Sequence, residues 1–147
     1  MFGGGNGLAN DVTSAKVTGN TNIFFANGTI AQSVYGGGNL AQVSGNTYVN
    51  ISGGTIGTNG QGGAVYGNVY GGGKGQETAS GVPFGLIAGN SNVLVSGSAA
   101  ILHNIYGGGS FGSVGTYTYD ASDNITGYTS GGTALDYITG TPTIGTT

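Results

Sequence analysis

The side chains that could perform acid–base chemistry are few in this chain, and they are scattered along it. Its five carboxylates are Asp11, Glu77, Asp120, Asp123 and Asp136. Enzymes that cleave polysaccharides hold a pair of carboxyl groups on either side of the bond. Asp120 and Asp123 are close in sequence, but an expected turn explains both, because aspartate side chains bond to turn backbone. We therefore expect no enzyme, with a polysaccharide-degrading β-helix kept as an alternative.

The residues needed for a metal or cofactor site are also missing from the pattern. His103 is the only histidine and there is no cysteine, so a zinc site cannot be assembled. Calcium-binding glycine-rich repeats place aspartate in every turn. The residues that follow the glycine triplets here are Asn6, Asn39, Lys74 and Ser110. We expect no cofactor and no metal.

Charge restricts the partners of the chain. With two lysines, no arginine and a net charge of −3, it cannot neutralise a row of phosphates, which excludes nucleic acid as an expected partner. No apolar run approaches the roughly 20 residues of a membrane span. The repeat pattern begins directly after Met1, without a leader sequence. We expect a piece of a longer protein or a subunit without its export signal.

An aromatic residue followed by three glycines occurs four times in the 147 residues. The aromatic positions are Phe2, Tyr35, Tyr70 and Tyr106, which are 33, 35 and 36 residues apart. A fixed period of this length is typical of repeat architectures, in which each unit packs on its neighbours. The predicted units of a single domain, 1–147, are about 2–34, 35–69, 70–105 and 106–147.

The repeated aromatic positions predict a column of stacked rings. Such a ladder would fix the register of the repeats if packed, or offer a platform for sugars if exposed. The neighbouring glycines favour the packed form, because they let backbones approach closely. The glycines predicted to be structural are Gly36, Gly37, Gly38, Gly71, Gly72, Gly73, Gly107, Gly108 and Gly109.

A second motif, Gly-Asn-Thr/Ser, begins at Gly19, Gly45 and Gly89 and precedes a short β-branched run each time. In the second copy, Val49 and Ile51 alternate with Asn50, as expected for a strand with one buried face. Helix is disfavoured by the high glycine content. These patterns predict an all-β, parallel β-helix (β-solenoid) fold with equivalent strands stacked, and about two turns of chain per unit.

The fourth unit departs from the repeat. Residues 116–129 contain two alternating segments around a four-residue turn, which predicts a projecting β-hairpin. The tyrosines in and after it could contact a ligand, and they are Tyr117, Tyr119, Tyr128 and Tyr137. A carbohydrate-binding module that uses these tyrosines and the 117–137 region is therefore an alternative function.

The segments 34–39 (VYGGGN) and 45–56 (GNTYVNISGGTI) resemble the glycine-rich repeats of large bacterial cell-surface, adhesin-like proteins. The resemblance covers residues 1 to about 115 and 130–147. It implies a parallel β-helix, an extracellular or cell-surface location, and a role as a stalk or in adhesion. It supplies no catalytic residues, and the predicted hairpin departs from its pattern.

Together these observations predict a non-enzymatic structural repeat module of an extracellular bacterial adhesin, stalk or self-assembling fibre. A glycan or host-surface ligand is a candidate partner. No charged terminal strand is expected, so open strand edges could pair end to end with another copy of the chain.

Overall fold

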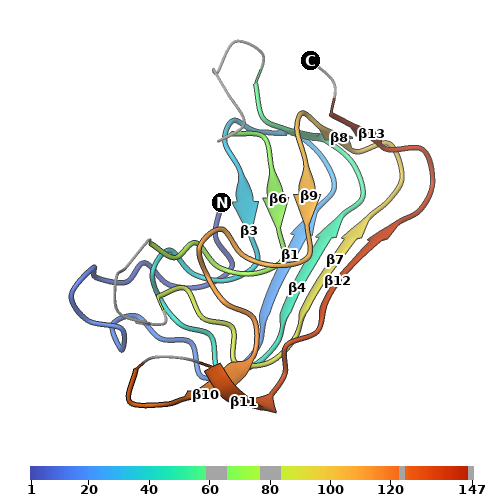
Figure 1. Ribbon diagram of the computed structural model, residues 1–147. Coiled ribbons are helices and arrows are strands. Elements are labelled where there is room, and N and C mark those ends of the chain that lie inside the picture. The colour runs from blue at the N-terminus through green and yellow to red at the C-terminus, as the bar shows by residue number, and fades with distance from the viewer. Residues whose placement is uncertain (59–65, 77–83, 123–124, 146–147) are drawn as a thin grey trace.

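The structure is a computed structural model that describes residues 1–58, 66–76, 84–122 and 125–145. Across these ranges the chain is all-β, without a helix, and its strands are short. Glycine, asparagine and serine interrupt the β-branched runs and so limit strand length. Parallel strands form three sheets, and one antiparallel pair stands apart from them (Figure 1). Within the described ranges, no helix could cross a membrane.

Each parallel sheet collects the equivalent strands of successive repeats. The first sheet has the order β1-β4-β7-β12, with β1 Thr21–Phe25, β4 Thr47–Ile51, β7 Ser91–Val95 and β12 Ala134–Ile138. The second sheet has the order β2-β5-β8-β13, with β2 Thr29–Ile30, β5 Thr55–Ile56, β8 Ala100–Ile101 and β13 Thr143–Ile144. The third sheet has the order β3-β6-β9, with β3 Val34–Tyr35, β6 Val69–Tyr70 and β9 Ile105–Tyr106.

The strand register agrees with the expectation from the Gly-Asn-Thr/Ser motif. Val49 pairs with Ile23 on one side and with Val93 on the other, and all three strands are parallel. The side chains of Val49 and Ile51 are buried, whereas that of Asn50 lies on the opposite face. The prediction of parallel stacking with an inward Val49 and Ile51 is therefore confirmed.

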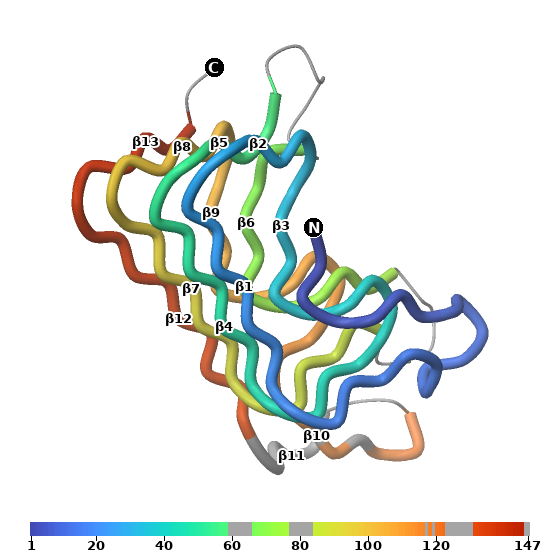
Figure 2. The backbone as a smooth tube through the Cα atoms, turned by 180° about the vertical axis from the view of Figure 1, so that it is seen from behind, coloured from blue at the N-terminus to red at the C-terminus, as the bar shows by residue number. Residues whose placement is uncertain are grey.

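The expected two turns of chain per unit are wrong. Tyr35 pairs directly with Tyr70, and Tyr70 pairs directly with Tyr106, so one unit returns the chain to the same sheet once. Between these returns the chain passes the row of isolated parallel bridges, then the first sheet and then the second sheet. Figure 2 shows the chain running along the sheets in this order. The loops differ in length because each single turn of the chain contributes to all three sheets and to the row of bridges.

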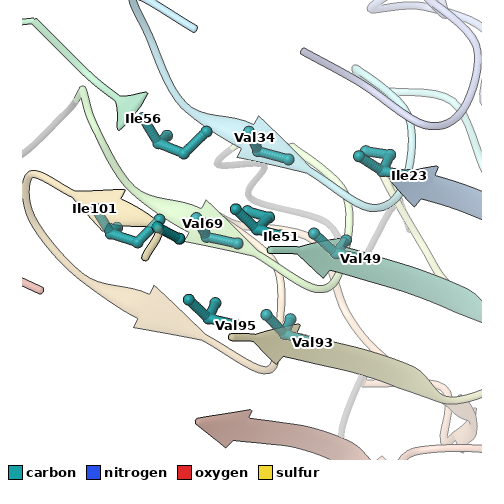
Figure 3. Packing of buried hydrophobic residues seen from close by; sticks show 10 residues of the cluster. Ile23, Val34, Val49, Ile51, Ile56, Val69, Val93, Val95 and Ile101 are labelled. Atoms are coloured by element: carbon teal, nitrogen blue, oxygen red, sulfur yellow. The ribbon is translucent and has the colours of Figure 1, made fainter. Parts of the chain in front are cut away.

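The core is a thin column between the sheets. Its buried members come from all three sheets and are nearly all β-branched, as Figure 3 shows. They are Ile23, Val34, Val49, Ile51, Ile56, Val69, Val93, Val95, Ala99 and Ile101. A second small cluster contains Val43, Ile87 and Val114, with Val17 against it, on the row of isolated bridges. One or two inward side chains per short strand are therefore enough to fill the interior.

The glycine triplets are places of close backbone approach between repeats. A Cβ atom on Gly37 would lie 2.5 Å from Ile87 Cδ1 and 2.8 Å from Gly73 Cα. A Cβ on Gly72 would lie 2.8 Å from the backbone nitrogen of Gly109. At Gly108, by contrast, a Cβ would meet nothing within 4 Å. Glycine is therefore required where another repeat packs above the triplet, because any Cβ atom would clash there.

The two sequence motifs are joined by a side-chain hydrogen bond in each of three units. Thr21 Oγ1 donates to the carbonyl oxygen of Gly36 at 2.6 Å, and Thr47 Oγ1 donates to that of Gly71 at 2.5 Å. Ser91 makes the same bond to Gly107. The hydroxyl of Gly-Asn-Thr/Ser thus satisfies a carbonyl of the next glycine triplet, which would be costly to leave unpaired in the interior.

The predicted hairpin is present as a separate two-stranded sheet at one edge of the molecule (Figure 1). It pairs β10 (Thr116–Tyr119) with β11 (Ile125–Ser130) in antiparallel fashion, with two irregularities in the register. At its turn, the backbone N–H of Ser122 donates to Asp120 Oδ1 at 2.8 Å. Asp120 therefore has the turn role expected from the sequence; Asp123 lies outside the described residues.

Candidate binding surface

The aromatic residues of the triplet motif form one stack on the outside of the third sheet. The ring centroids of Phe2 and Tyr35, of Tyr35 and Tyr70, and of Tyr70 and Tyr106 are separated by 4.8, 4.8 and 4.9 Å. Neighbouring rings are inclined by only 3–11°. These centroid distances match the spacing of hydrogen-bonded strands, so the parallel register places each ring over the next.

The stack is covered in its middle and open at its ends. Tyr35 is 8% exposed, whereas Phe2 and Tyr106 at the ends are 38% and 43% exposed. Burial raises the pKa of the Tyr35 phenol, and the adjacent Tyr70 raises that pKa further. Burial also raises the pKa of Tyr70, against a hydrogen bond from Ser110 that lowers it. The inner rings therefore act mainly as packing, and only ring edges and end faces meet solvent.

A ladder of asparagines fixes the start of the strands in the first sheet. Asn20 Oδ1 accepts the backbone N–H of Asn46 at 2.8 Å, and Asn46 Oδ1 accepts that of Asn90 at 2.8 Å. Asn90 Oδ1 in turn accepts the N–H of Thr133 at 3.1 Å. Each asparagine thus satisfies a backbone donor of the next repeat. This role is not evident from the sequence, although asparagine recurs after glycine in each copy of the motif.

The outer face of the first sheet carries three exposed aromatic side chains. Phe24 is 77% exposed, Tyr137 54% and Tyr48 38%. Alternation along the strands puts two rows of side chains on this face. The rows are Asn22, Tyr48, Asn92 and Leu135, and Phe24, Asn50, Leu94 and Tyr137. In each row, asparagine stands between larger apolar or aromatic side chains.

A groove runs among these side chains, and we call it the outer-face groove. It is lined by Asn22, Phe24, Tyr48, Asn50, Asn92, Leu94 and Tyr137, together with Val49 and Val93. The lining therefore alternates rings or a leucine with carboxamides, and these described residues include no charged side chain. Asn46 Nδ2 donates to the hydroxyl of Tyr48 at 3.3 Å, which restrains one wall of the groove.

The tyrosines predicted as ligand contacts are only partly placed. Tyr137 lies on β12, paired with Leu94, and lines the outer-face groove. Tyr117, Tyr119 and Tyr128 belong to the hairpin by their backbones, and their side chains lie outside what the structure describes. The groove residues Phe24, Tyr48, Asn50 and Asn92 were not predicted as contacts. Their outward position in the alternating strands was the signal that could have found them.

Among the described residues, which leave out Glu77 and Asp123, the ionisable side chains that could do chemistry are not gathered at this surface. Asp11 Oδ1 accepts hydrogen bonds from the backbone N–H and the hydroxyl of Thr13, and these bonds lower its pKa. Asp136 lies on β12 beside Val93, and His103 donates its backbone N–H to Gly67. Among the described residues, no group of three His, Cys, Asp or Glu side chains could hold a metal ion.

The chain matches no protein-family model, no curated protein and no solved structure.

Proposed function

We propose that the chain is a β-solenoid: a non-enzymatic structural repeat module of an extracellular bacterial adhesin, stalk or self-assembling fibre. The observation that carries the proposal is the in-register stacking of like residues from successive units. Tyr35 lies against Tyr70 and Thr47 against Ser91, while Val49 lies against Val93. A fold that repeats its own contacts can be lengthened by adding units, as a stalk or fibre requires.

The contacts between units would also make such a module stiff. Neighbouring units are tied by backbone ladders in three sheets, by the asparagine ladder and by the stacked rings. Each added unit would lengthen the solenoid by about 4.8 Å, the spacing of paired strands. A module of this kind holds a surface at a fixed distance and orientation, which is the physical task of a stalk.

The proposed location and assembly depend on composition and on the sheet edges. A chain with few charges tends to place its surfaces against other molecules, as a fibre or adhesin does. The resemblance to surface-protein repeats points to the cell exterior. β1 and β12 are the outer strands of the first sheet, so end-to-end association would use one or both of them.

Duplication of one unit tests the solenoid directly. A second copy of residues 35–69, inserted after residue 69, should fold and raise the midpoint of thermal unfolding, because stability grows with the number of unit interfaces. Small-angle scattering should show a longer particle of unchanged cross-section. A scrambled 35-residue insert at the same place is the control. An unfolded duplicate, or one that is wider rather than longer, would contradict the solenoid.

The extracellular role has a separate test. Antibodies raised against the purified chain should label intact cells of the source organism. Labelling only after the cells are lysed would overturn the surface location while leaving the solenoid itself standing. Electron microscopy of the purified chain would show fibres if the units assemble end to end.

A further inference from the structure

We infer that the outer-face groove binds a neutral carbohydrate chain. The inference names a ligand class for the adhesin proposed above, and it rests on that proposal only for its biological setting. The groove lies on the first sheet, whose four strands are the longest of the parallel strands in the described ranges. Its walls and its polar groups come from all four of these strands.

The groove is held in shape before any ligand arrives. Val49 and Val93, which contribute to its lining, belong to the fully packed core. The strands beneath it are locked by in-register backbone pairing from Thr21 to Phe25 and from Thr47 to Ile51. The hydrogen bond from Asn46 restrains the ring of Tyr48. A preorganised site loses less conformational entropy on binding, so even shallow contacts contribute to affinity.

The side chains of the groove match the two kinds of surface on a sugar. A sugar ring carries C–H groups on its faces, which pack against flat apolar surfaces such as the rings of Phe24, Tyr48 and Tyr137. Its hydroxyl groups both donate and accept hydrogen bonds. The carboxamides of Asn50 and Asn92 can do the same, because each has an oxygen acceptor and an NH₂ donor.

The absence of charge in the described lining selects among ligands. An acidic sugar or a phosphate would be desolvated in the groove without a cation to pair with, which costs more than the contact returns. A purely apolar peptide would cover the asparagine side chains and bury polar atoms that need hydrogen-bond partners, although Asn92 Nδ2 already donates to the carbonyl oxygen of Thr47 at 3.5 Å. A neutral glycan satisfies both the rings and the carboxamides, and a chain of sugars can follow the groove across the strands.

The first experiment screens the purified chain against an array of neutral and acidic oligosaccharides and measures the neutral hits by isothermal titration calorimetry. Phe24→Ala and Tyr48→Ala should each weaken binding about tenfold or more, as expected for aromatic anchors. Asn50→Ala should weaken it less, and Tyr48→Phe, which keeps the ring but loses its hydrogen bond from Asn46, should weaken it less than Tyr48→Ala does. Phe111→Ala removes an exposed aromatic outside the groove and should leave the affinity unchanged within about twofold.

Several outcomes would overturn the inference. These are binding of acidic sugars alone, equal loss of affinity in the Phe111→Ala control, or no neutral glycan bound by a folded chain. A concentration-dependent dimer that Phe24→Ala abolishes would assign the groove to a second copy of the chain instead. Circular dichroism of every variant separates these outcomes from failure of the scaffold. A chain that unfolds on unit duplication yet binds neutral glycans would contradict the solenoid and keep the site.

Discussion

β7 and β12 are neighbours in the same sheet, yet only one of them contributes to the core. Both strands have five residues and pair in register over their whole length. On β7 the inward residues Val93 and Val95 are fully buried, whereas all of β12 is exposed. The inward position that holds Val93 on β7 holds Asp136 on β12. Backbone pairing therefore extends the sheet one strand further than the apolar core reaches.

The comparison separates two contributions to a repeat fold. Backbone hydrogen bonds need only an extended neighbour, and β12 supplies one. The core needs a β-branched side chain at each inward position, and the hydroxyl bond to the glycine triplet needs threonine or serine. β12 has Ala134 where β7 has Ser91, so it could not form that bond. An inward charge on an outer strand is also a known protection against unwanted strand addition.

This finding refines one expectation about assembly. No charged terminal strand is expected from the sequence, and β13, the last strand of the chain, carries no charge. One of the two outer strands of the first sheet, β12, nevertheless carries Asp136 on its inward side. If copies of the chain associate end to end, the β1 edge is therefore the better candidate. Its inward residue Ile23 is apolar and its edge is not blocked by charge.

The largest expected effect comes from giving β7 the residue of β12. Val93→Asp places a carboxylate at a fully buried position with no cation beside it in the described core. We expect a loss of about 3–5 kcal/mol, the cost of an uncompensated buried charge. Urea denaturation followed by circular dichroism measures it, with Val93→Ala as the control for lost volume. Similar stability of the Asp and Ala variants would show that this position is accessible to water.

Substitution in the glycine triplets should have the next largest effect. Gly72→Val should lower the free energy of unfolding by more than about 2 kcal/mol, because its Cβ would press on the backbone of Gly109. Gly108→Val is the matched control in the next unit, where a Cβ has open space, and should change stability by less than about 0.5 kcal/mol. Equal losses in the two variants would show that backbone entropy, rather than the contact between repeats, requires glycine.

The inner and the outer face of the first sheet differ in how far their residues could be predicted from the sequence. The strand register was predictable because the inward residues repeat in type, as Ile23, Val49 and Val93 do. The aromatic stack was predictable because its members recur at a fixed period. The number of turns of chain per unit was not predictable, because loop length does not reveal which segments pair.

The outer-face groove could not be found by looking for repeats. Its second row reads Phe24, Asn50, Leu94 and Tyr137, so the residue type changes at every strand. The row therefore cannot be recognised from recurring residue types. These side chains come together only through the register in which the strands pair. The asparagine ladder is the opposite case: its residues recur, but hydrogen bonds between repeats become visible only when the strands are stacked.

The reverse exchange on β12 should produce a smaller effect of opposite sign. Asp136→Val extends the apolar column by one residue and should stabilise the chain by about 0.5–1 kcal/mol, less than the roughly 1.5–3 kcal/mol of a fully buried side chain. Urea denaturation measures this change, and Asp136→Asn is the control for loss of charge alone. Light scattering should also show more association in the Val variant if Asp136 protects this edge. A variant that is both less stable and still monomeric would contradict the edge role.

The smallest expected effect concerns the two inner rings of the aromatic stack at high pH. Burial raises the pKa of Tyr35 and of Tyr70 above the value near 10 of a free phenol, so the folded state holds these protons more tightly than the unfolded state. The stability linked to them is therefore fully present below about pH 10 and is lost as the pH rises through the folded-state values. Denaturation of the wild type at pH 8 and pH 11 should show this loss. A Tyr35→Phe, Tyr70→Phe double variant keeps the stacked rings without the phenols, and its stability should fall less over the same interval. If the double variant loses as much stability as the wild type, the loss at high pH does not come from the phenols of Tyr35 and Tyr70. Burial of the inner rings would then have no measurable effect on how stability depends on pH.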